Sequence, residues 1–372
     1  MEPVHRALAA DQAFALDLIV TGMHLLPEFA SSLAEVRADR LGELHQLAIS
    51  AAGDTGAAMA QSIGSGLLGF APLLERLRPD IVLLQGDRGE MLAAAIAAAH
   101  MNLPLVHMSG GDRSGSIDDS VRNAISKFAH FHLTSCGAST QRLLELGERA
   151  ERIVEVGDPA LDQLRTLEFL PRGALESELR LPSGEPYLVA TLHPVTDEAD
   201  AAAAQMRTLL EALAQSGLTV VFTYPNSDAG GRAMREVLES WRAAPFLRIE
   251  ASLGSRRYLS LLRHAAGMVG NSSSGIVESP SLRIPAINIG SRQQGRLRAG
   301  NVIDVPFERE AIVGAVRFAL HDAAYRKELA SCTNPYGDGH AAERTLDVLR
   351  RLRLGPELTA KWRTPGGKLL DV

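Results

Sequence analysis

The sequence predicts an α/β protein with parallel β-sheets, divided into two domains. Its 372 residues are too many for one ordinary hydrophobic core and suit two domains of typical size. Short apolar runs alternate with segments of helical periodicity along the whole chain. Strands that alternate with helices in this way form parallel sheets whose two faces are covered by helices.

Eleven short apolar runs are expected to form the strands. The first five are Ala15–Val20, Ile81–Gln85, Leu103–Met108, Phe131–Thr134 and Arg152–Val156. The other six are Tyr187–Leu192, Leu218–Thr223, Phe246–Glu250, Met268–Gly270, Ala286–Ile289 and Val302–Val305. Helical spacing separates them, as in Met91, Ala95, Ile96 and Ala99, and in Val121, Ile125 and Phe128.

The domain boundaries follow from composition and periodicity. Glu168–Pro186 holds three prolines and weak periodicity, so we expect it to contain the linker. An N-terminal domain is expected over residues 1–168 and a second domain over 183–339. A C-terminal helix and tail over 340–372 could return to the first domain. The chain opens on an expected helix near Glu2–Ala10, and we interpret this as the absence of an initial strand from this sequence.

Composition narrows the class of protein. Apolar residues make up 46% and charged residues 22%, which argues against disorder, and the net charge of −6 argues against a nucleic-acid partner. Cys136 and Cys332 are far apart, which excludes a disulfide scaffold and a cysteine zinc site and suits a reducing compartment. We expect no apolar run to approach the ~20 residues that span a bilayer. The expectation is a cytoplasmic protein without a membrane partner.

Polar residues collect after five of the expected strands. In open parallel sheets, ligands bind beyond the carboxyl ends of the strands. The five segments are Gly86–Glu90, Ser109–Ser116, His193-Pro194, Tyr224–Asp228 and Asn271–Gly275. Since these strand ends come from both domains, we expect them to converge on an inter-domain cleft.

The serine-rich segment Asn271–Gly275 precedes a helix expected to start near Gly275. Free backbone N–H groups and serine hydroxyls there could hold a phosphate. The alternative is that the serines only cap the helix, which serines do routinely. Glu278 could accept hydrogen bonds from a ribose or lie on a solvated face. Arg292 could meet a pyrophosphate charge or be an ordinary exposed arginine.

The segment before the expected helix at Val121 has two interpretations. Ser116 could cap that helix, and Asp118 and Arg122 are spaced as a surface ion pair. The functional interpretation instead turns Asp119 into the cleft beside Asp87. The two carboxylates, with a histidine, would then form a set able to move protons at different pKa values.

Two histidines follow expected strands, and several familiar catalytic motifs are absent. His193 ends a strand and precedes a proline that stiffens the turn, and His24 follows the first expected strand. The sequence has no P-loop and no Gly-x-Ser-x-Gly elbow, which argues against a P-loop NTPase and a serine hydrolase. The Gly-x-Gly-x-x-Gly match at Gly64–Gly69 follows no expected strand, which weakens a dehydrogenase interpretation.

Taken together, these motifs resemble the UDP-N-acetylglucosamine 2-epimerase family. The resemblance is greatest to its hydrolysing branch, which makes precursors of sialic and other nonulosonic acids. The matching segments, in family order, are Thr21–Leu25, Gln85–Arg88, Gly110–Asp112, Ser114–Arg122, His193–Thr196, Pro225–Gly230, Gly270–Gly275 and Tyr336–Gly339.

The resemblance implies two Rossmann-like domains in a glycosyltransferase-B-like arrangement, with UDP bound by the second. It also implies a homodimer or homotetramer and a reaction without a metal or cofactor. The implied substrate is UDP-N-acetylglucosamine or a UDP-2,4-diacetamido-trideoxyhexose. UDP leaves the anomeric carbon as the C2 proton is removed, and water adds to a glycal-like intermediate to release the free 2-epimer. A nearby carboxylate would stabilise the oxocarbenium character.

The resemblance also implies roles for particular residues. Asp87 and His193 would be acid–base residues, with Asp119 in support and Asp112 as a further carboxylate. Residues implied to bind substrate are His24, Arg88, Arg122, Asn226, Ser272, Ser273, Ser274, Glu278 and Arg292. Of these, Ser273, Glu278 and Arg292 would hold the UDP moiety.

Two departures from the family pattern leave other functions possible besides the hydrolysing epimerase. Many relatives carry glutamate where this chain has Ser109, and serine needs an activator to act as a base. Relatives also begin with a strand and a nucleotide-contacting turn. The alternatives are a non-hydrolysing epimerase, a non-catalytic nucleotide-sugar-binding protein and, on fold analogy alone, a glycosyltransferase. Ile117–Ser120 and Asn226–Gly230 favour the hydrolysing branch.

Overall fold

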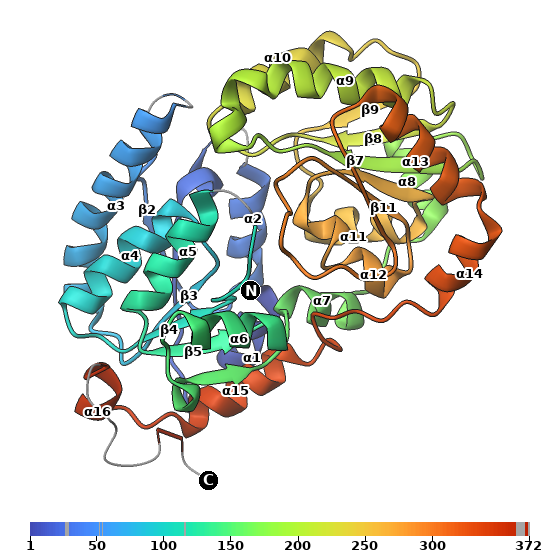
Figure 1. Ribbon diagram of the computed structural model, residues 1–372. Helices are drawn as coiled ribbons and strands as arrows, with labels where there is room; N and C mark the ends of the chain where they lie inside the picture. The colour runs from blue at the N-terminus through green and yellow to red at the C-terminus, as the bar shows by residue number, and fades with distance from the viewer. Residues whose placement is uncertain (27–29, 52, 54, 115–116, 362–368, 371–372) are drawn as a thin grey trace. The chain divides into compact units, whose positions relative to one another are not determined.

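The computed structural model divides the chain into two compact units, each an α/β fold with parallel strands (Figure 1). Unit 1 comprises Met1–Gly53, Ala57–Arg165 and Tyr336–Val372, and unit 2 comprises Asp54–Gly56 and Thr166–Pro335. The structure describes residues 1–26, 30–51, 53, 55–114, 117–361 and 369–370. Ser116, proposed as a helix cap, lies outside the described residues. The α/β class with parallel sheets is confirmed.

Unit 1 contains two parallel sheets. The larger has the order β3-β4-β5-β6, and the smaller pairs β1 with β2. The strands are β1 (Asp17–Thr21), β2 (Glu43–Leu47), β3 (Val82–Gln85), β4 (Leu105–Met108), β5 (Phe131–Thr134) and β6 (Ile153–Glu155). The α-helices are α1 (Glu2–Ala9), α2 (Ala30–Asp39), α3 (Gly56–Leu77), α4 (Gly89–His100), α5 (Ile117–Phe128), α6 (Gly137–Glu145), α7 (Pro159–Thr166), α15 (Ala341–Arg351) and α16 (Pro356–Thr359). The short 3₁₀ turn η1 (Gly22–Leu25) follows β1, and a second, η3 (Ala150–Arg152), precedes β6.

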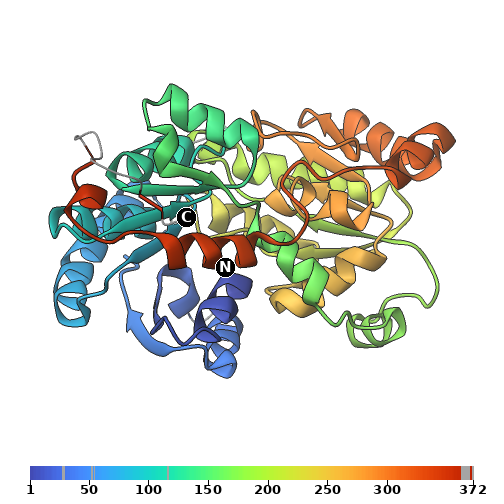
Figure 2. The ribbon, with the colours of Figure 1, turned by 90° about the horizontal axis from the view of Figure 1, so that it is seen from below.

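Helices cover both faces of the larger sheet in unit 1. Phe70 of α3, Ala94 of α4 and Ile125 of α5 pack on one face in a core with Leu84 and Leu105. On the other face α1 packs beside α15 (Figure 2). The carboxylate of Asp162, on α7, accepts hydrogen bonds from the first backbone N–H groups of α15 at 2.8 and 2.9 Å. The C-terminal helix therefore belongs to unit 1.

Unit 2 is built on one six-stranded parallel sheet of order β12-β11-β10-β7-β8-β9. The strands are β7 (Tyr187–Thr191), β8 (Thr219–Thr223), β9 (Leu247–Glu250), β10 (Gly267–Gly270), β11 (Ala286–Ile289) and β12 (Val302–Val305). The helices are α8 (Arg172–Leu179), α9 (Ala202–Ala214), α10 (Gly231–Ser240), α11 (Gly254–His264), α12 (Ser279–Leu282), α13 (Arg309–His321) and α14 (Ala323–Ala330), with 3₁₀ turns η4 (Thr196–Ala201) and η5 (Ser273–Gly275). Buried residues of α9, α10 and α13 cover one face, and those of α8 and α11 cover the other.

All eleven expected strands are present, and within the described residues the structure adds one that was not expected. The additional strand, β2, carries Glu43 and His45, and none of its residues is fully buried, so it lacks an apolar run. The interpretation of Glu168–Pro186 as linker is wrong. It contains α8, which buries Leu175 and Leu179 in the core of unit 2. Pro171 precedes this helix, and Pro182, Gly184 and Pro186 follow it, so they lie at its two ends.

The expectation that no apolar run approaches membrane-spanning length is also wrong. Among the described helices, α3 is long and apolar enough to cross a membrane, with a mean hydropathy of 1.3. In the structure its Phe70 and Leu74 face the core of unit 1, whereas Leu68 is 81% exposed. Gly69 allows close packing on β2, since a Cβ there would lie 2.5 Å from the Leu47 side chain. The helix is therefore one layer of the α/β unit.

A buried group of charges holds the C-terminal segment to unit 1. The Glu148 carboxylate is 1% exposed, and its oxygens lie 2.6 Å from Lys361 Nζ, 3.0 Å from Lys127 Nζ and 3.1 Å from His132 Nε2. Burial alone would raise the pKa of Glu148, but the hydrogen bonds from His132 and Lys361 lower it to about 2. The buried Arg152 adds hydrogen bonds to backbone carbonyls of α16.

We expect Glu148→Gln to lower the free energy of unfolding by about 2 kcal/mol at pH 7, because it removes the buried anion that pairs with the largely buried Lys361 ammonium and accepts a hydrogen bond from His132. The folded-state pKa is depressed from 4.5 to about 2, so this stabilisation is full above pH 4.5 and is lost as the pH falls toward 2. Urea unfolding at several pH values measures it. Glu151→Gln, at a half-exposed pair with Arg149, is the control and should change little. Equal stability of the two variants would contradict the assignment.

Candidate functional site

A buried arginine gathers the candidate carboxylates of unit 1. Asp87 follows β3, Asp112 follows the neighbouring β4, and both Asp119 and Arg122 lie on α5. The Arg122 side chain is 2% exposed and donates hydrogen bonds to the carboxylates of Asp87 and Asp119, the latter at 2.9 Å. It also donates to the backbone carbonyl of Asp112 at 2.8 Å. Asp119 therefore lies beside Asp87, as the functional interpretation expects, and Arg122 is not a surface residue.

The two carboxylates remain partly accessible. Their side chains are 20% exposed at Asp87 and 23% at Asp119. The backbone N–H and hydroxyl of Ser114 donate to the same oxygen of Asp119, at 2.7 and 3.0 Å. Because guanidinium stays protonated, two anions share one fixed positive charge. Partly exposed carboxylates held in this way can stabilise positive charge that develops on a bound substrate.

His107 positions the turn that carries Asp87. The ring is fully buried, with Nε2 2.8 Å from the carbonyl oxygen of Gly86 and Nδ1 3.0 Å from the hydroxyl of Ser126. Burial lowers the pKa of His107 to about 3, so the imidazole is neutral. The sequence analysis treated this residue only as part of the strand over Leu103–Met108. Its partner is 21 residues away, and no local pattern indicates the contact.

Asp112 has partners that point to a structural role. One carboxylate oxygen accepts hydrogen bonds from the hydroxyls of Ser135 and Ser139, at 2.5 and 2.6 Å. Gly111 before it has φ +75°, and a Cβ there would lie 2.1 Å from the carbonyl oxygen of Ser139. The Gly111-Asp112 turn is therefore packed tightly on the first turn of α6. Ser109, the departure from the family, is buried and also has a positive φ of 63°.

His24 and Arg88 lie at the same edge of unit 1. His24 is in η1, directly after β1, and Arg88 follows Asp87. Partial burial lowers the pKa of His24, the Glu90 carboxylate opposes this and the Arg88 guanidinium adds to it. A Cβ on Gly22 would lie 2.1 Å from Oε1 of Glu90, which places the carboxyl ends of β1 and β3 close together. Both candidates therefore lie near the Asp87 turn.

In unit 2 the candidates lie at the carboxyl ends of four adjacent strands, β8, β7, β10 and β11. Asn271, after β10, is 1% exposed and binds the backbone of His193, which follows β7. Its Oδ1 accepts from the His193 N–H at 2.7 Å, and its Nδ2 donates to the His193 carbonyl at 2.8 Å. The Asn271 carbonyl in turn accepts from Arg292 at 3.1 Å and Gln293 at 2.8 Å. Asn271 and Gln293 were not among the proposed site residues.

The loop after β8 completes this group. The backbone N–H of Asn226 donates to Nδ1 of His193 at 3.1 Å. The Asn226 side chain donates to the buried Asp228 carboxylate at 2.5 Å, which fixes the loop. Next to Arg292, the Ser291 hydroxyl donates to Glu198 at 2.7 Å. Polar groups from four strand ends thus surround His193 and Arg292.

The serine segment does not start a regular helix. Ser273–Gly275 forms the 3₁₀ turn η5, and the α-helix that follows, α12, spans only Ser279–Leu282 with Glu278 at its N-cap position. The expected helix start near Gly275 is therefore wrong. Ser272 accepts a hydrogen bond from the backbone N–H of Ser274 at 3.4 Å, so it caps the turn. Tyr258, which sequence reasoning missed, lies beneath the serines, and burial raises its pKa.

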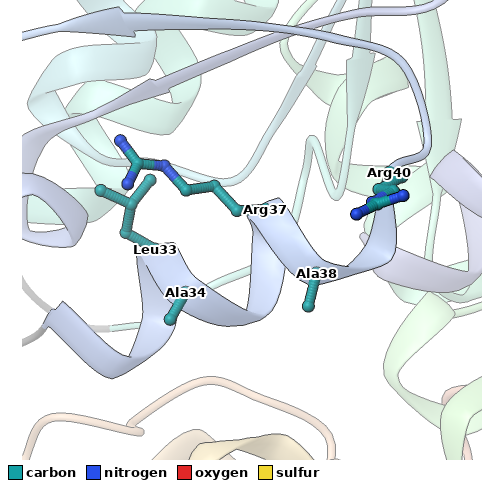
Figure 3. Close-up of a pocket in the computed structure, with 5 residues that line it drawn as sticks. All are labelled: Leu33, Ala34, Arg37, Ala38 and Arg40. Carbon is teal, nitrogen blue, oxygen red and sulfur yellow. The ribbon is translucent and has the colours of Figure 1, made fainter.

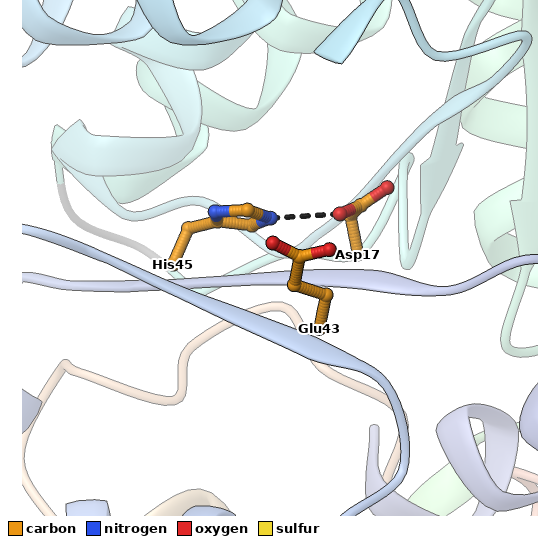
Figure 4. A group of neighbouring side chains, drawn as sticks. All are labelled: Asp17, Glu43 and His45. Atoms are coloured by element: carbon orange, nitrogen blue, oxygen red, sulfur yellow. Dashed lines mark hydrogen bonds and ion pairs between the residues drawn. The ribbon is translucent and has the colours of Figure 1, made fainter.

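Two further features lie apart from these groups. Asp17, Glu43 and His45, on the paired strands β1 and β2, place ligand atoms within 4.8 Å of one another (Figure 4). These residues are of a type that binds metals, but Asp17 and Glu43 are exposed and Asp17 pairs with His45 at 2.7 Å.

A hollow of about 810 Å³ is lined by four residues of α2 and by the residue that follows the helix. None of them is a candidate site residue: Leu33, Ala34, Arg37, Ala38 and Arg40 (Figure 3).

The contacts of Asp112 predict that its charge is dispensable for catalysis. Asp112→Asn retains an oxygen that accepts from Ser135 and Ser139, so kcat should stay within about threefold of the unchanged protein. The free energy of unfolding should fall by about 1 kcal/mol, since a neutral acceptor replaces a charged one. Steady-state kinetics and urea unfolding measure both, and the loss should shrink in a Ser135→Ala background. A hundredfold loss of kcat at unchanged stability would make Asp112 a catalytic carboxylate.

Comparison with known proteins places the chain in one family. The family model described as UDP-N-acetylglucosamine 2-epimerase matches residues 6–350. A protein of Legionella pneumophila named UDP-N,N'-diacetylbacillosamine 2-epimerase (hydrolyzing) is 37% identical over 361 residues, which cover 97% of this chain and 94% of that protein. A GDP/UDP-N,N'-diacetylbacillosamine 2-epimerase (hydrolyzing) of Campylobacter jejuni is 37% identical over 79% of this chain and 77% of its own.

The fold is also similar to that of solved UDP-GlcNAc 2-epimerases. The crystal structure of a UDP-GlcNAc 2-epimerase from Neisseria meningitidis bound to UDP-GlcNAc superposes with a TM-score of 0.78. The match covers 94% of this chain and 96% of that one, at 18% sequence identity. The glycosyltransferase-B-like class expected from the sequence is thereby confirmed. The chain belongs to the UDP-N-acetylglucosamine 2-epimerase family.

Proposed function

We propose that this chain is a hydrolysing 2-epimerase that converts a UDP-2,4-diacetamido-trideoxyhexose of the N,N'-diacetylbacillosamine type, with water, into UDP and the free 2-epimeric sugar. The observation that carries this is the pair of carboxylates held by Arg122 at the ends of β3 and α5, where the reaction needs acid–base groups. The names of the Legionella and Campylobacter relatives support the hydrolysing outcome and the diacetamido substrate.

The reaction requires a carboxylate as proton acceptor and as stabiliser of positive charge, because the C2 proton is poorly acidic. The anomeric C–O bond breaks first, and its electron pair leaves with UDP. The C2–H electrons then form the double bond of a glycal-like intermediate, and the proton passes to a carboxylate, for which Asp87 and Asp119 are the candidates. Addition of water returns a proton to the opposite face of C2 and places the hydroxyl on C1. A fixed carboxylate also lowers the energy of the oxocarbenium-like state.

The second half of the proposal is that unit 2 holds UDP. Arg292 presents a guanidinium that Asn271 anchors, and a guanidinium suits the bidentate recognition of a diphosphate. The hydroxyls of Ser272, Ser273 and Ser274 and the Glu278 carboxylate would supply further hydrogen bonds to UDP.

Cellular setting and assembly are also proposed. Cys136 and Cys332 are both free thiols, which suits a cytoplasmic enzyme. A homodimer or homotetramer is proposed from the family resemblance alone.

The product identifies the reaction. Incubation with UDP-N,N'-diacetylbacillosamine should release UDP and a free 2-epimeric sugar, and in deuterated water the product should carry deuterium at C2. Liquid chromatography with mass spectrometry detects both. A product that retains UDP would indicate the non-hydrolysing reaction, and a UDP-GlcNAc control compares the two donors. Free sugar without deuterium at C2 would contradict proton removal, and UDP release only with a sugar acceptor would indicate a glycosyltransferase.

Substitutions should separate chemistry from UDP binding. Asp87→Asn should lower kcat at least a hundredfold, on the order of a general acid–base contribution, and change the Kd for UDP little. Arg292→Ala should instead weaken UDP binding at least about tenfold, because it removes a charge that faces the diphosphate. Calorimetric titration with UDP and steady-state kinetics give the two quantities. Equal effects of both substitutions on UDP affinity would contradict the division of roles.

A further inference from the structure

His193 is held on both its backbone and its ring. The side-chain amide of Asn271 binds the His193 N–H and carbonyl, at 2.7 and 2.8 Å. The backbone N–H of Asn226 binds ring atom Nδ1 at 3.1 Å. The two contacts come from the ends of β10 and β8, which flank β7 on either side. The backbone and the ring orientation of His193 are thus both fixed by its neighbours.

A carboxylate cannot replace the Asn271 amide without losing part of this hold. It is 1% exposed, and its own backbone N–H donates to the Thr191 carbonyl at 3.1 Å. Gly270 before it has φ +137°, and a Cβ there would lie 1.9 Å from the Thr191 carbonyl oxygen. The end of β10 therefore lies tightly against β7. Binding an N–H and a C=O together requires one acceptor and one donor, which an amide has and a carboxylate lacks.

The contact to Nδ1 determines where the imidazole proton lies. A backbone N–H can only donate, so Nδ1 accepts with its lone pair and carries no proton. In a neutral imidazole the proton is then on Nε2. An Nε2 that carries a proton has no lone pair left to take one from carbon. The same atom is able to donate a hydrogen bond to an oxygen.

We propose that Asn271 is a positioning residue that fixes His193 as a hydrogen-bond donor through Nε2, so that His193 faces the departing phosphate oxygen and does not remove the C2 proton. This deepens the proposed function and rests on it. The electron pair of the anomeric C–O bond then goes to UDP, whose oxygen accepts the Nε2–H hydrogen bond. The C2 proton goes to a carboxylate of the Arg122 group. His193 therefore serves the leaving group, whereas Asp87 or Asp119 serves C2.

The tautomer is measurable directly in the full chain labelled with ¹⁵N-histidine. Two-bond ¹⁵N–¹H correlation spectra distinguish Nε2–H, Nδ1–H and the imidazolium, and His193→Gln identifies the His193 signals. We expect Nε2–H at pH 7.5 without ligand. Asn226→Pro deletes the donating N–H and should remove this preference, while Asn226→Ala keeps the N–H and should preserve it. A protonated Nδ1 in the unchanged protein would overturn the proposal.

Kinetics test the role of the donor. His193→Gln can present an N–H near the Nε2 position, so its kcat should exceed that of His193→Ala by at least about tenfold, within the range measured for a single donor. Equal, complete loss of activity in both variants, each folded by circular dichroism, would indicate a base and overturn the proposal.

Asn271→Asp tests the positioning. It removes the donor to the His193 carbonyl, and we expect at least a tenfold lower kcat together with a changed His193 tautomer signal. The matched control is Asn288→Asp, a buried asparagine on β11 that contacts Asp304 instead of His193 and should alter stability only. If the two variants had the same kcat and the same His193 tautomer signal, Asn271 would have a structural role only, and the proposal would be overturned. Should the unchanged protein turn over no donor, the proposed function fails while the tautomer spectra still report on His193.

Discussion

The buried charge of Arg122 is the constraint on which the rest of unit 1 depends. A guanidinium that is 2% exposed must be neutralised where it lies, because an uncompensated buried charge costs several kcal/mol. Asp87 and Asp119 provide the two anions, and the Asp112 carbonyl provides a further acceptor. The chain must therefore bring the turns after β3 and β4 against α5. His107 below Gly86 and the serines beside Asp112 hold those turns in place.

In unit 2 the neutral amide of Asn271, and not a buried charge, holds the candidate residues together. The candidate residues follow four neighbouring strands, and the side-chain amide and backbone carbonyl of Asn271 join three of the strand ends. Hydrogen bonds of this kind orient side chains without adding charge. Fixed donors facing a diphosphate and fixed carboxylates facing a sugar carbon are the two electrostatic requirements of a reaction that expels UDP and removes a proton from C2.

Much of the fold was predictable because its strands are short apolar runs buried on both faces, as in Phe131–Thr134 and Ala286–Ile289. The exceptions have physical causes. β2 is only partly buried, so Glu43 and His45 interrupt its apolar pattern. Prolines and a glycine on both sides conceal α8, and the buried face that identifies it needs the packed core.

The positions of the candidate residues were predictable to the extent that these residues follow strands directly. Asp87, His193 and Arg292 could be proposed from their positions after strands, and Asp119 from its place in the first turn of a helix. His107, Gln293 and the role of Asn271 could not, because their partners are about 20 to 80 residues away and no local spacing records such contacts. The serine segment was misjudged since capping of a 3₁₀ turn and the start of a helix share the same residues.

The central proposal is that the Arg122-held carboxylates of unit 1 act on C2 of the sugar, and that the His193 group of unit 2 binds the diphosphate. A crystal structure of Asp87→Asn with an intact UDP-diacetamido sugar tests it most directly. The account predicts C2 of the sugar within hydrogen-bonding reach of residue 87 or Asp119, and the diphosphate on Nε2 of His193 and the guanidinium of Arg292. Electron density that places the sugar against other residues, or the diphosphate away from His193, would contradict it.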